Sequence, residues 1–413
     1  MLAPERRTRA DVLAATAIVL VVVVAAALLW WRSDARATTS MVAEEPAAAL
    51  VAATRVPPTL SESWQAPSAA TTAPVVAGGV VATADGSEVA GRTPSTGQTR
   101  WSYTRANSTL CAAAGQWSLV VAVYRTNRGC SDVTALQAST GARGAQRTSL
   151  ADDQVTLLGD GVYLASIGST RTEVWRSDLV RTMELGRVDA PVNPGSQPRE
   201  GCAIRSVASS TSRVAVVFSC PGEAGERLSL FGPTPDDATK PAELATTLLG
   251  VDGARAVAEA GDRTVVYLPG EQPVLTVYDS GARPVSTVPV AAADAPPPRT
   301  GSAEGARLVE PTTTLGSTLL WWTGRATVAL GTGDYSTAWA QPGALGPGVE
   351  MATQLLLPVP EGIAVLSPAT GLRMRTIDVP RPAGSVPPGQ ALELAVAGTV
   401  VLEQRGATVV ALS

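Results

Sequence analysis

The pattern of apolar and polar positions changes after residue 31. Residues 12–31, VLAATAIVLVVVVAAALLWW, contain no charged side chain. A helix rises about 1.5 Å per residue, so these residues span the roughly 30 Å hydrocarbon core of a bilayer. The run therefore predicts a transmembrane helix, with Trp30 and Trp31 at the outer interface, where aromatic rings are enriched.

Basic residues before the apolar run set its orientation. Arg6, Arg7 and Arg9 favour a cytoplasmic N-terminus for residues 1–11. The sequence thus predicts a single-pass plasma-membrane protein with an extracytoplasmic C-terminal domain. The alternative is a cleaved signal peptide, because residues 35–37 (Ala-Arg-Ala) have the small-x-small form of a cleavage site. Apolar cores of such peptides usually have about 7 to 15 residues, so the longer run favours an uncleaved anchor.

Two different patterns follow the anchor. Residues 32–58 are rich in Ala, Thr, Pro and Glu without a sustained period, a composition that predicts a flexible linker. Residues 59–413 instead repeat a unit of four apolar strands separated by turns, with no helical period. The units begin near Ala73, Thr109, Gln154, Gly201, Gly253, Arg307, Gly348 and Ala391.

The repeated unit predicts an all-β domain of the β-propeller class. Its second strands, such as VAVVF at 214–218 and TLLWW at 318–322, are continuously apolar, as in strands buried on both faces. Four-stranded units of this length fit propeller blades better than a sandwich. We count eight blades, or seven if two of the longer units are misdivided.

The last unit supplies only three strands of its own. A segment just after the linker, Leu60–Gln65, provides the missing fourth. We therefore expect an N-terminal strand to complete the C-terminal blade. This arrangement closes the ring and removes two exposed sheet edges.

The first unit resembles the quinoprotein-type (PQQ-like) propeller repeat. In that repeat an apolar strand pair is followed by Asp-Gly, then Thr-Gly, then a Trp four residues later. Asp85-Gly86, Thr96-Gly97 and Trp101 match it, and the turn recurs degenerately at Thr140-Gly141 and Thr370-Gly371, where Ala145 and Arg375 stand in the Trp position. Glycine supplies the positive φ of such a turn, and a Trp beyond it would wedge against the next blade.

The resemblance implies a fold rather than an activity. Quinoprotein dehydrogenases of this fold are marked by adjacent cysteines against the quinone and by Asn and acidic ligands to calcium. This chain has no Cys-Cys pair, and its three asparagines (Asn107, Asn127, Asn193) lie beside no matching motif. The resemblance therefore points to a non-enzymatic, membrane-anchored member without cofactor, similar to propellers that serve as envelope-assembly scaffolds.

Composition narrows the chemistry further. The chain has no His. This excludes catalytic triads that contain His, metal sites with His ligands, and acid–base catalysis by imidazole. Residues beyond 32 carry a net charge of about −6, since the first 32 residues hold four of the 32 basic and two of the 36 acidic residues. An acidic domain argues against nucleic acid as a partner.

Four cysteines in an extracytoplasmic domain predict disulfides. If Ala208 faces Val214 across a hairpin, the same register brings Cys202 opposite Cys220. Cys111 and Cys130 belong to the second blade. A bridge between blades two and four exceeds the ~7 Å limit on the distance between Cα atoms. We therefore predict the pairs Cys111–Cys130 and Cys202–Cys220.

Carboxylates and aromatic residues are the remaining candidates for a site. Two acids suffice for glycoside hydrolysis, but the acids beside Gly, Pro or strand ends are typical turn formers: Asp152, Asp153, Asp160, Asp236, Asp237, Asp252 and Asp334. The tryptophans at Trp64, Trp101, Trp117, Trp175 and Trp339 are expected to pack between blades. The pair Trp321-Trp322 is expected to do the same, with a sugar- or peptide-stacking surface as the alternative.

These observations predict a membrane-anchored propeller that binds or scaffolds a protein partner in the bacterial cell envelope. One alternative is binding or sensing of a small envelope ligand or glycan. A carboxylate-dependent hydrolase is the other. Nothing in the sequence identifies the partner, the ligand or the functional face.

Overall fold

The computed structural model describes residues 8–299 and 308–413. A 23-residue helix, α1 (Arg9–Trp31), is followed after Arg32 and Ser33 by the single turn α2 (Asp34–Ala37). Thr8 caps α1, because its side chain accepts a hydrogen bond from the Asp11 amide. Helix α1 is exposed along its whole length and is long and apolar enough to cross a membrane.

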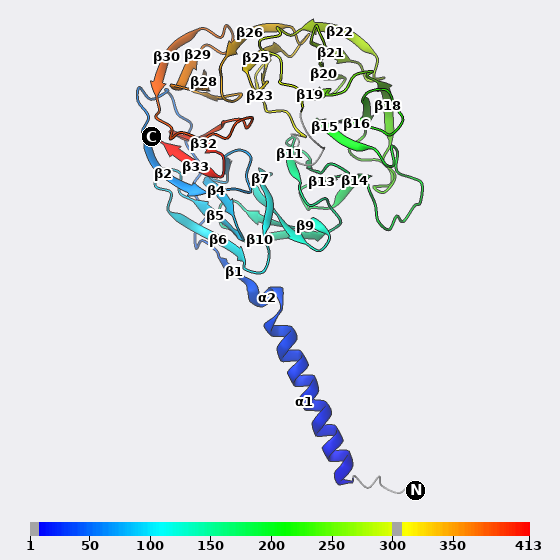
Figure 1. Ribbon diagram of the computed structural model, residues 1–413. Helices are drawn as coiled ribbons and strands as arrows, with labels where there is room; N and C mark the ends of the chain where they lie inside the picture. Colours follow the sequence, from blue (N-terminus) through cyan, green and yellow to red (C-terminus); the bar gives the residue numbers. More distant parts are fainter. Residues whose placement is uncertain (1–7, 300–307) are drawn as a thin grey trace.

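The rest of the described chain forms a ring of eight four-stranded antiparallel blades (Figure 1). In each blade the first strand lies nearest the centre of the ring, and the fourth lies outermost except in blade one, where a further strand pairs outside it. The alternative count of seven blades is therefore wrong. The first four blades consist of β3 (Val75–Ala77), β4 (Val80–Asp85), β5 (Glu88–Arg92), β6 (Thr99–Arg105); β7 (Leu110–Gln116), β8 (Leu119–Thr126), β9 (Gly129–Gln137), β10 (Arg143–Thr148); β11 (Thr156–Gly159), β12 (Leu164–Ile167), β13 (Arg171–Trp175), β14 (Arg181–Gly186); and β15 (Ala203–Ser209), β16 (Val214–Ser219), β17 (Arg227–Phe231), β18 (Glu243–Leu248).

The last four blades continue the same order around the ring. They consist of β19 (Arg255–Ala260), β20 (Arg263–Leu268), β21 (Val274–Tyr278), β22 (Pro284–Pro289); β23 (Thr312–Leu315), β24 (Thr318–Trp322), β25 (Ala326–Gly331), β26 (Thr337–Pro342); β27 (Val349–Met351), β28 (Gln354–Val359), β29 (Gly362–Leu366), β30 (Arg373–Asp378); and β31 (Glu393–Ala397), β32 (Val400–Arg405), β33 (Thr408–Leu412) with β2 (Glu62–Pro67). The predicted unit starts lie one to two residues before the first strand in seven of the blades, while Arg307, predicted to begin the sixth, lies outside the described residues.

Ring closure follows the predicted scheme. Strand β2 pairs antiparallel with β33, for example Gln65 with Val410. The amide and carbonyl of Ser61 also exchange hydrogen bonds of 3.0 Å with those of Ser413. The second strands are buried on both faces as predicted: every residue of β12, β32 and the Val214–Phe218 part of β16 is buried. Apolar burial between neighbouring blades is therefore the main stabilising interaction of the ring.

The segment predicted as a flexible linker, residues 32–58, lies against the ring from Thr38 onwards. Strand β1 (Thr38–Met41) adds a fifth strand to the outer edge of blade one by pairing with β6. The amides of Ala43 and Ala47 then donate to the carbonyls of Thr140 and Ser139 in blade two. Further along, Val56 is buried against blades seven and eight. We call residues 42–60 the strap.

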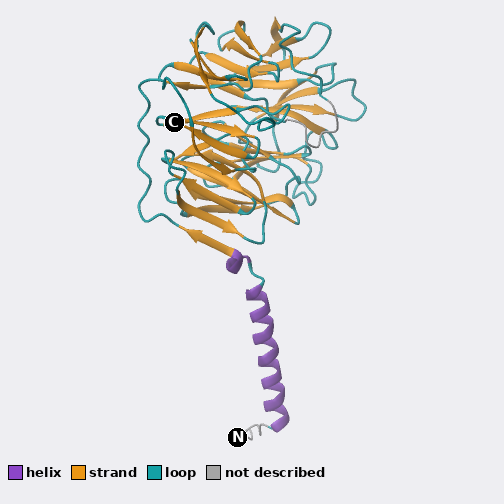
Figure 2. Ribbon diagram, turned by 60° about the vertical axis from the view of Figure 1, so that its left-hand side comes forward, coloured by secondary structure: helices purple, strands orange, loops and turns teal. Residues whose placement is uncertain are grey.

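The linker was predicted because its residues show no sustained apolar period, which a segment with a core of its own would need. An extended segment needs no such period, since it can satisfy its backbone groups against existing turns and bury a few side chains. The strap crosses one face of the ring, over the β9–β10, β3–β4 and β31–β32 turns, and Figure 2 shows the connecting loop along one side of the blades. We call this the strap face. The opposite one is the groove face.

Candidate binding surfaces

The Thr-Gly turns predicted from the repeat form contacts between successive blades. The glycines Gly97, Gly141 and Gly371 have φ values of +70°, +76° and +67°. A Cβ added to Gly141 would lie 2.7 Å from the ring of Trp101 in the preceding blade. In the same way, a Cβ added to Gly97 would lie 2.7 Å from the ring of Trp64, and one added to Gly371 would lie 2.6 Å from the ring of Trp339.

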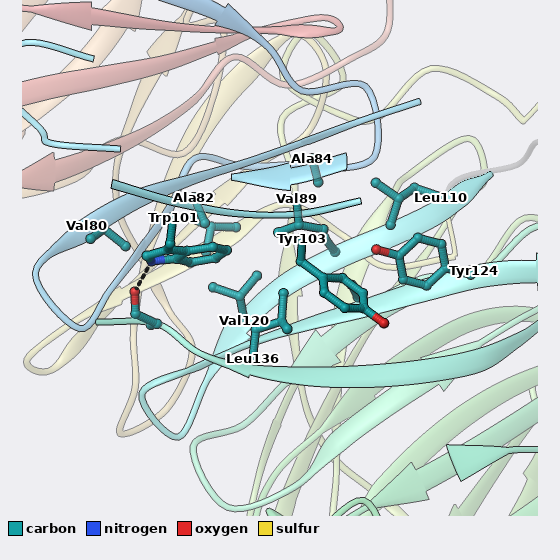
Figure 3. Packing of buried hydrophobic residues seen from close by; sticks show 14 residues of the cluster. Val80, Ala82, Ala84, Val89, Trp101, Tyr103, Leu110, Val120, Tyr124 and Leu136 are labelled. Atoms are coloured by element: carbon teal, nitrogen blue, oxygen red, sulfur yellow. Dashed lines mark hydrogen bonds between the residues drawn. The ribbon is translucent and has the colours of Figure 1, made fainter. Parts of the chain in front are cut away.

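Each tryptophan also donates its indole N–H to the turn it covers. Nε1 of Trp101 donates to the Ala138 carbonyl at 2.8 Å, as Figure 3 shows. Trp64 and Trp339 donate to Pro94 and Pro368, again three residues before the glycine. Within the turns the hydroxyls of Thr96, Thr140 and Thr370 accept from the amide two residues on, at 3.3 Å. The repeat residues are thus structural, and Asp85-Gly86 forms the tight β4–β5 turn, with Gly86 at φ +57°.

Arg375 takes a different partner because blade eight lacks this turn. The third and fourth strands of blade eight come from opposite ends of the chain, so no Thr-Gly hairpin joins them. Strap carbonyls lie there instead, and the Arg375 guanidinium donates to those of Val56, Pro57 and Pro58 at 3.2, 2.8 and 3.2 Å. An Arg in the Trp position of the repeat marks the blade next to the closure.

Both predicted disulfides are present. Cys111 bridges Cys130 with a distance of 5.8 Å between Cα atoms, and Cys202 bridges Cys220 with 4.3 Å. The register behind the second prediction was wrong near the turn, because Ser209 rather than Ala208 faces Val214. An irregularity between Ile204 and Ser206 shifts the pairing by one residue and brings Cys202 opposite Cys220.

The remaining tryptophans of the ring are buried or cover neighbouring blades, as predicted. Trp321 has no exposed surface and its ring centroid lies 5.6 Å from that of Tyr267 in blade five. Trp322 is 4% exposed and donates to the Ala344 carbonyl. This burial rules out the alternative that the pair forms a stacking surface. Trp175 is buried between blades two and three, and Trp117 donates to the Val162 carbonyl of blade three.

Most of the candidate acids serve turns or local ion pairs. Asp160, Asp237 and Asp334 accept hydrogen bonds from amides two or three residues further on. Asp153 is exposed and pairs with Arg125 at 3.0 Å. These contacts support the prediction that the acids are turn formers.

Asp152 is an exception, since it joins two blades. From the β10–β11 connection its carboxylate accepts from the amide and hydroxyl of Thr170 at 2.7 and 2.5 Å, and from the Arg171 amide at 3.2 Å. The Arg187 guanidinium lies 3.3 Å away. With both oxygens occupied, Asp152 is held as a structural contact between blades two and three.

A groove of about 920 Å³ lies around Asp152 on the groove face. It is lined by the β8–β9 turn, the β10–β11 connection and the β12–β13 turn, together with residues after β14. Besides Asp152, its charged lining residues are of both signs and are Arg125, Arg128, Asp153, Arg187 and Asp189. None of the described residues that line it is aromatic. The groove therefore offers hydrogen bonds and charge rather than an apolar or stacking surface.

Buried ion pairs inside the blades escaped prediction. Glu403 is fully buried and lies 2.6 Å from both Arg381 and Arg405. In blade three, Arg171 pairs with Glu173 and Glu184 at 2.6 and 2.8 Å. Burial opposes ionisation of Glu173, but Arg147 and Arg171 hold its pKa below the usual value. The sequence feature that could have predicted these ion pairs is the presence of charged residues within otherwise apolar strands, such as Arg171-Thr-Glu173 in β13.

A second cleft lies where the N-terminal helical segment joins the ring. Its volume is about 580 Å³, and α2, β1 and β6 form one side while β9 and β10 of blade two form the other. Arg105 lies between the two sides, 2.8 Å from Asp132 and 3.8 Å from Asp34. Among the described residues, no group of three or more Cys, Asp or Glu is arranged to hold a metal ion.

Comparison with known proteins identifies the fold and no closer family. No family model matches the chain, and no curated protein matches its sequence. Among solved structures, BamB from Moraxella catarrhalis is 14% identical, with a TM-score of 0.50 over 86% of this chain and 100% of that one. The computationally designed Ika8 protein is 11% identical, with a TM-score of 0.55 over 88% of this chain and 99% of that one. Sqt1 from Saccharomyces cerevisiae is 9% identical, with a TM-score of 0.51 over 86% of this chain and 97% of that one. The propeller fold implied by the resemblance to the quinoprotein-type repeat is confirmed.

Proposed function

We propose that this chain is a membrane-anchored, extracytoplasmic propeller that binds a protein partner in the cell envelope and catalyses no reaction. The groove between blades two and three carries the proposal. It is open and polar, whereas sites for small molecules are mostly apolar and enclosed. Arginine is enriched in protein interfaces, and Arg125, Arg128 and Arg187 all line the groove.

The junction of α1 with the ring supports an anchor rather than a cleaved signal. Cleavage after Ala37 would remove α2, which packs against blade one. Asp34 accepts a hydrogen bond from Asn107, and the Ala106 amide donates to the Ala37 carbonyl at 2.9 Å. The two disulfides suit an oxidising compartment outside the cytoplasm.

Absence of catalysis is proposed from the chemistry of the side chains. The chain has no His. In the groove, Asp152 is fully hydrogen-bonded and its neighbour Asp153 pairs with Arg125. Among the neighbours in fold, BamB is a propeller of similar size, and at 14% identity its likeness to this chain extends to the fold alone.

Photocrosslinking in the native cells tests the proposal. A photoreactive residue replaces Arg128 in the groove, and in a control it replaces Arg283, an exposed residue after β21. We expect one envelope protein to be captured from position 128 and not from position 283. Charge reversal by Arg125→Glu with Arg187→Glu should lower capture at least about tenfold, since truncating interfacial charge pairs costs about 2 to 5 kcal/mol.

The opposite outcomes have defined meanings. Equal capture from both positions, or capture unaffected by charge reversal, would overturn the groove as the binding surface. If no protein is captured but an envelope glycan raises the melting temperature of the wild type and not of the charge-reversed variant, the ligand-binding alternative replaces the proposal.

A further inference from the structure

The anchor enters the ring without a free segment. Helix α1 ends at Trp31, and only Arg32 and Ser33 separate it from α2. The Ser33 hydroxyl donates to the Trp30 carbonyl at 2.8 Å, and the Arg36 guanidinium lies 3.6 Å from the centre of the Trp31 ring. Strand β1 begins at the residue after α2 and pairs with β6 at once, Thr38 with Arg105.

This continuity places one particular part of the ring at the membrane. Tryptophan prefers the headgroup level of a bilayer, so Trp30 and Trp31 mark its outer surface. The rim of blades one and two then lies directly above that surface. Figures 1 and 2 both show α1 leaving the ring and pointing away from it, and Figure 1 shows blades five and six on the opposite side of the ring.

The rim at the anchor carries basic side chains on two blades. Arg36 is exposed on α2, and Arg143 is exposed at the start of β10. Arg147 lines the same cleft and belongs to a buried cluster in which three arginines face two glutamates, Glu173 and Glu184. Burial first, and the neighbouring Arg181 and Arg171, lower the pKa of Arg147.

Acidic residues in the cleft do not cancel this charge. Both of them, Asp34 and Asp132, are shared with Arg105, which lies between them. No ion pair to Arg36 or Arg143 occurs within residues 8–299 and 308–413. The domain as a whole is acidic, so a basic surface at the root of the anchor runs against its average charge.

We propose that the rim of blades one and two is a docking surface for the bilayer, and that its arginines bind phosphates of anionic phospholipids in the leaflet around α1. The proposal rests on the membrane anchoring proposed above. The ring then stands on its edge, with the groove face and the strap face both perpendicular to the membrane. Each arginine near an anionic surface contributes about fivefold to its attraction, and salt weakens this effect.

The test uses the full chain in vesicles of phosphatidylcholine, with or without phosphatidylglycerol. All four cysteines are in disulfides, so an introduced cysteine provides one labelling site. A fluorophore is attached at Thr148→Cys on the exposed rim beside the cleft, or at Ser286→Cys on exposed β22 of blade five. Lipids with a nitroxide headgroup quench a fluorophore at the membrane surface.

We expect quenching at position 148 and none at position 286. Addition of phosphatidylglycerol should strengthen quenching at 148, and the double variant Arg36→Gln/Arg143→Gln should abolish this increase. A control, Arg263→Gln/Arg283→Gln, removes two arginines of blade five, of which Arg283 is exposed and Arg263 is partly exposed, and should leave the increase unchanged.

Each contrary outcome overturns the proposal. Equal quenching at both positions means that the ring does not stand on this rim. If quenching at position 148 is the same with and without phosphatidylglycerol, or if the double variant does not reduce the increase, the arginines do not bind lipid phosphate. Resistance of every variant to extraction by alkaline carbonate is measured separately, so failure of α1 to anchor the chain is distinguished from failure of the docking surface.

Discussion

The glycine of each Thr-Gly turn meets two requirements at once. Gly141 needs a positive φ of +76°, and it also leaves room for the ring of Trp101. Gly86 has a positive φ of +57° as well, but no atom lies within 4 Å of the position a Cβ would take. A comparison of substitutions at Gly86 and Gly141 therefore distinguishes the cost of backbone strain from the cost of disturbing a contact between blades.

We predict that Gly141→Ala lowers the free energy of unfolding more than Gly86→Ala does. Gly86→Ala should cost roughly 1 to 2 kcal/mol from the left-handed backbone alone. Gly141→Ala adds displacement of the Trp101 ring, so an additional loss of about 1 to 3 kcal/mol is expected from overpacking. Denaturant unfolding of both variants measures the difference. Equal losses would mean that the indole moves aside freely.

Glu259 is a second residue whose environment sets a measurable property. It is 9% exposed, and its burial raises the pKa of its carboxyl to about 7, although Thr264 donates a hydrogen bond to it and Arg213 lies nearby. The folded protein thus holds this proton more tightly than the unfolded chain does. Its contribution to stability is complete below the usual pKa near 4.5 and is lost as the pH rises through 7.

We therefore predict that Glu259→Gln stabilises the protein at pH 8 relative to the wild type and has less effect at pH 5. The gain at pH 8 should be at most about 3 kcal/mol, because one pKa unit corresponds to about 1.4 kcal/mol. Denaturant midpoints at both pH values provide the measurement. A constant difference between variant and wild type would contradict the assignment of this shift to Glu259.

At the scale of elements, the strap is held by Arg375 from β30. One guanidinium donates to three consecutive carbonyls, and Val56 is buried beside them. Arg373 lies two residues earlier on the same strand and is exposed, so it provides a matched control. Hydrogen bonds of charged groups contribute about 1.5 to 3 kcal/mol when they are partly buried.

Arg375→Ala should consequently release residues 56–58, lower the free energy of unfolding by about 1.5 to 3 kcal/mol, and speed exchange of the amide hydrogens of the strap. Arg373→Ala should leave both the free energy of unfolding and the amide exchange of the strap unchanged. Hydrogen exchange read by mass spectrometry reports on the strap directly. Unchanged exchange in the Arg375 variant would show that the other strap contacts suffice.

Strands and blades were predictable from the sequence, and the strap was not. The second strands are mostly apolar because both of their faces are buried, and runs such as VAVVF in β16 and TLLWW in β24 give a strong local signal. The Cys202–Cys220 pair was predicted from a hairpin register that is one residue off near the turn, and the Cys111–Cys130 pair from the exclusion of a bridge between distant blades. Residues 42–60 give no such signal, because their hydrogen bonds go to turns of other blades. The groove likewise depends on which loops the ring brings together, and Asp152 finds Thr170 only across a blade boundary.

At the scale of the molecule, closure distinguishes two parts of the N-terminal segment. We predict that deletion of residues 59–65 unfolds or strongly destabilises the whole ring, because β2 is the fourth strand of blade eight. Deletion of residues 33–55 removes β1 and part of the strap, and should lower the melting temperature modestly while the ring stays folded. Thermal unfolding followed by circular dichroism compares the two. Losses of the same size would mean that β2 is no more important than the strap.

Pairing of β2 with β33 also imposes an order of events on biosynthesis. The chain is synthesised from its N-terminus, so β2 emerges early, with its partner still more than 300 residues away in sequence. Blades one to seven hold all their own strands and can form in turn. Blade eight cannot, and β2 keeps an unpaired edge exposed until β33 arrives. The newly made chain therefore has a period of vulnerability to aggregation and proteolysis, and the length of this period depends on how soon β33 is synthesised.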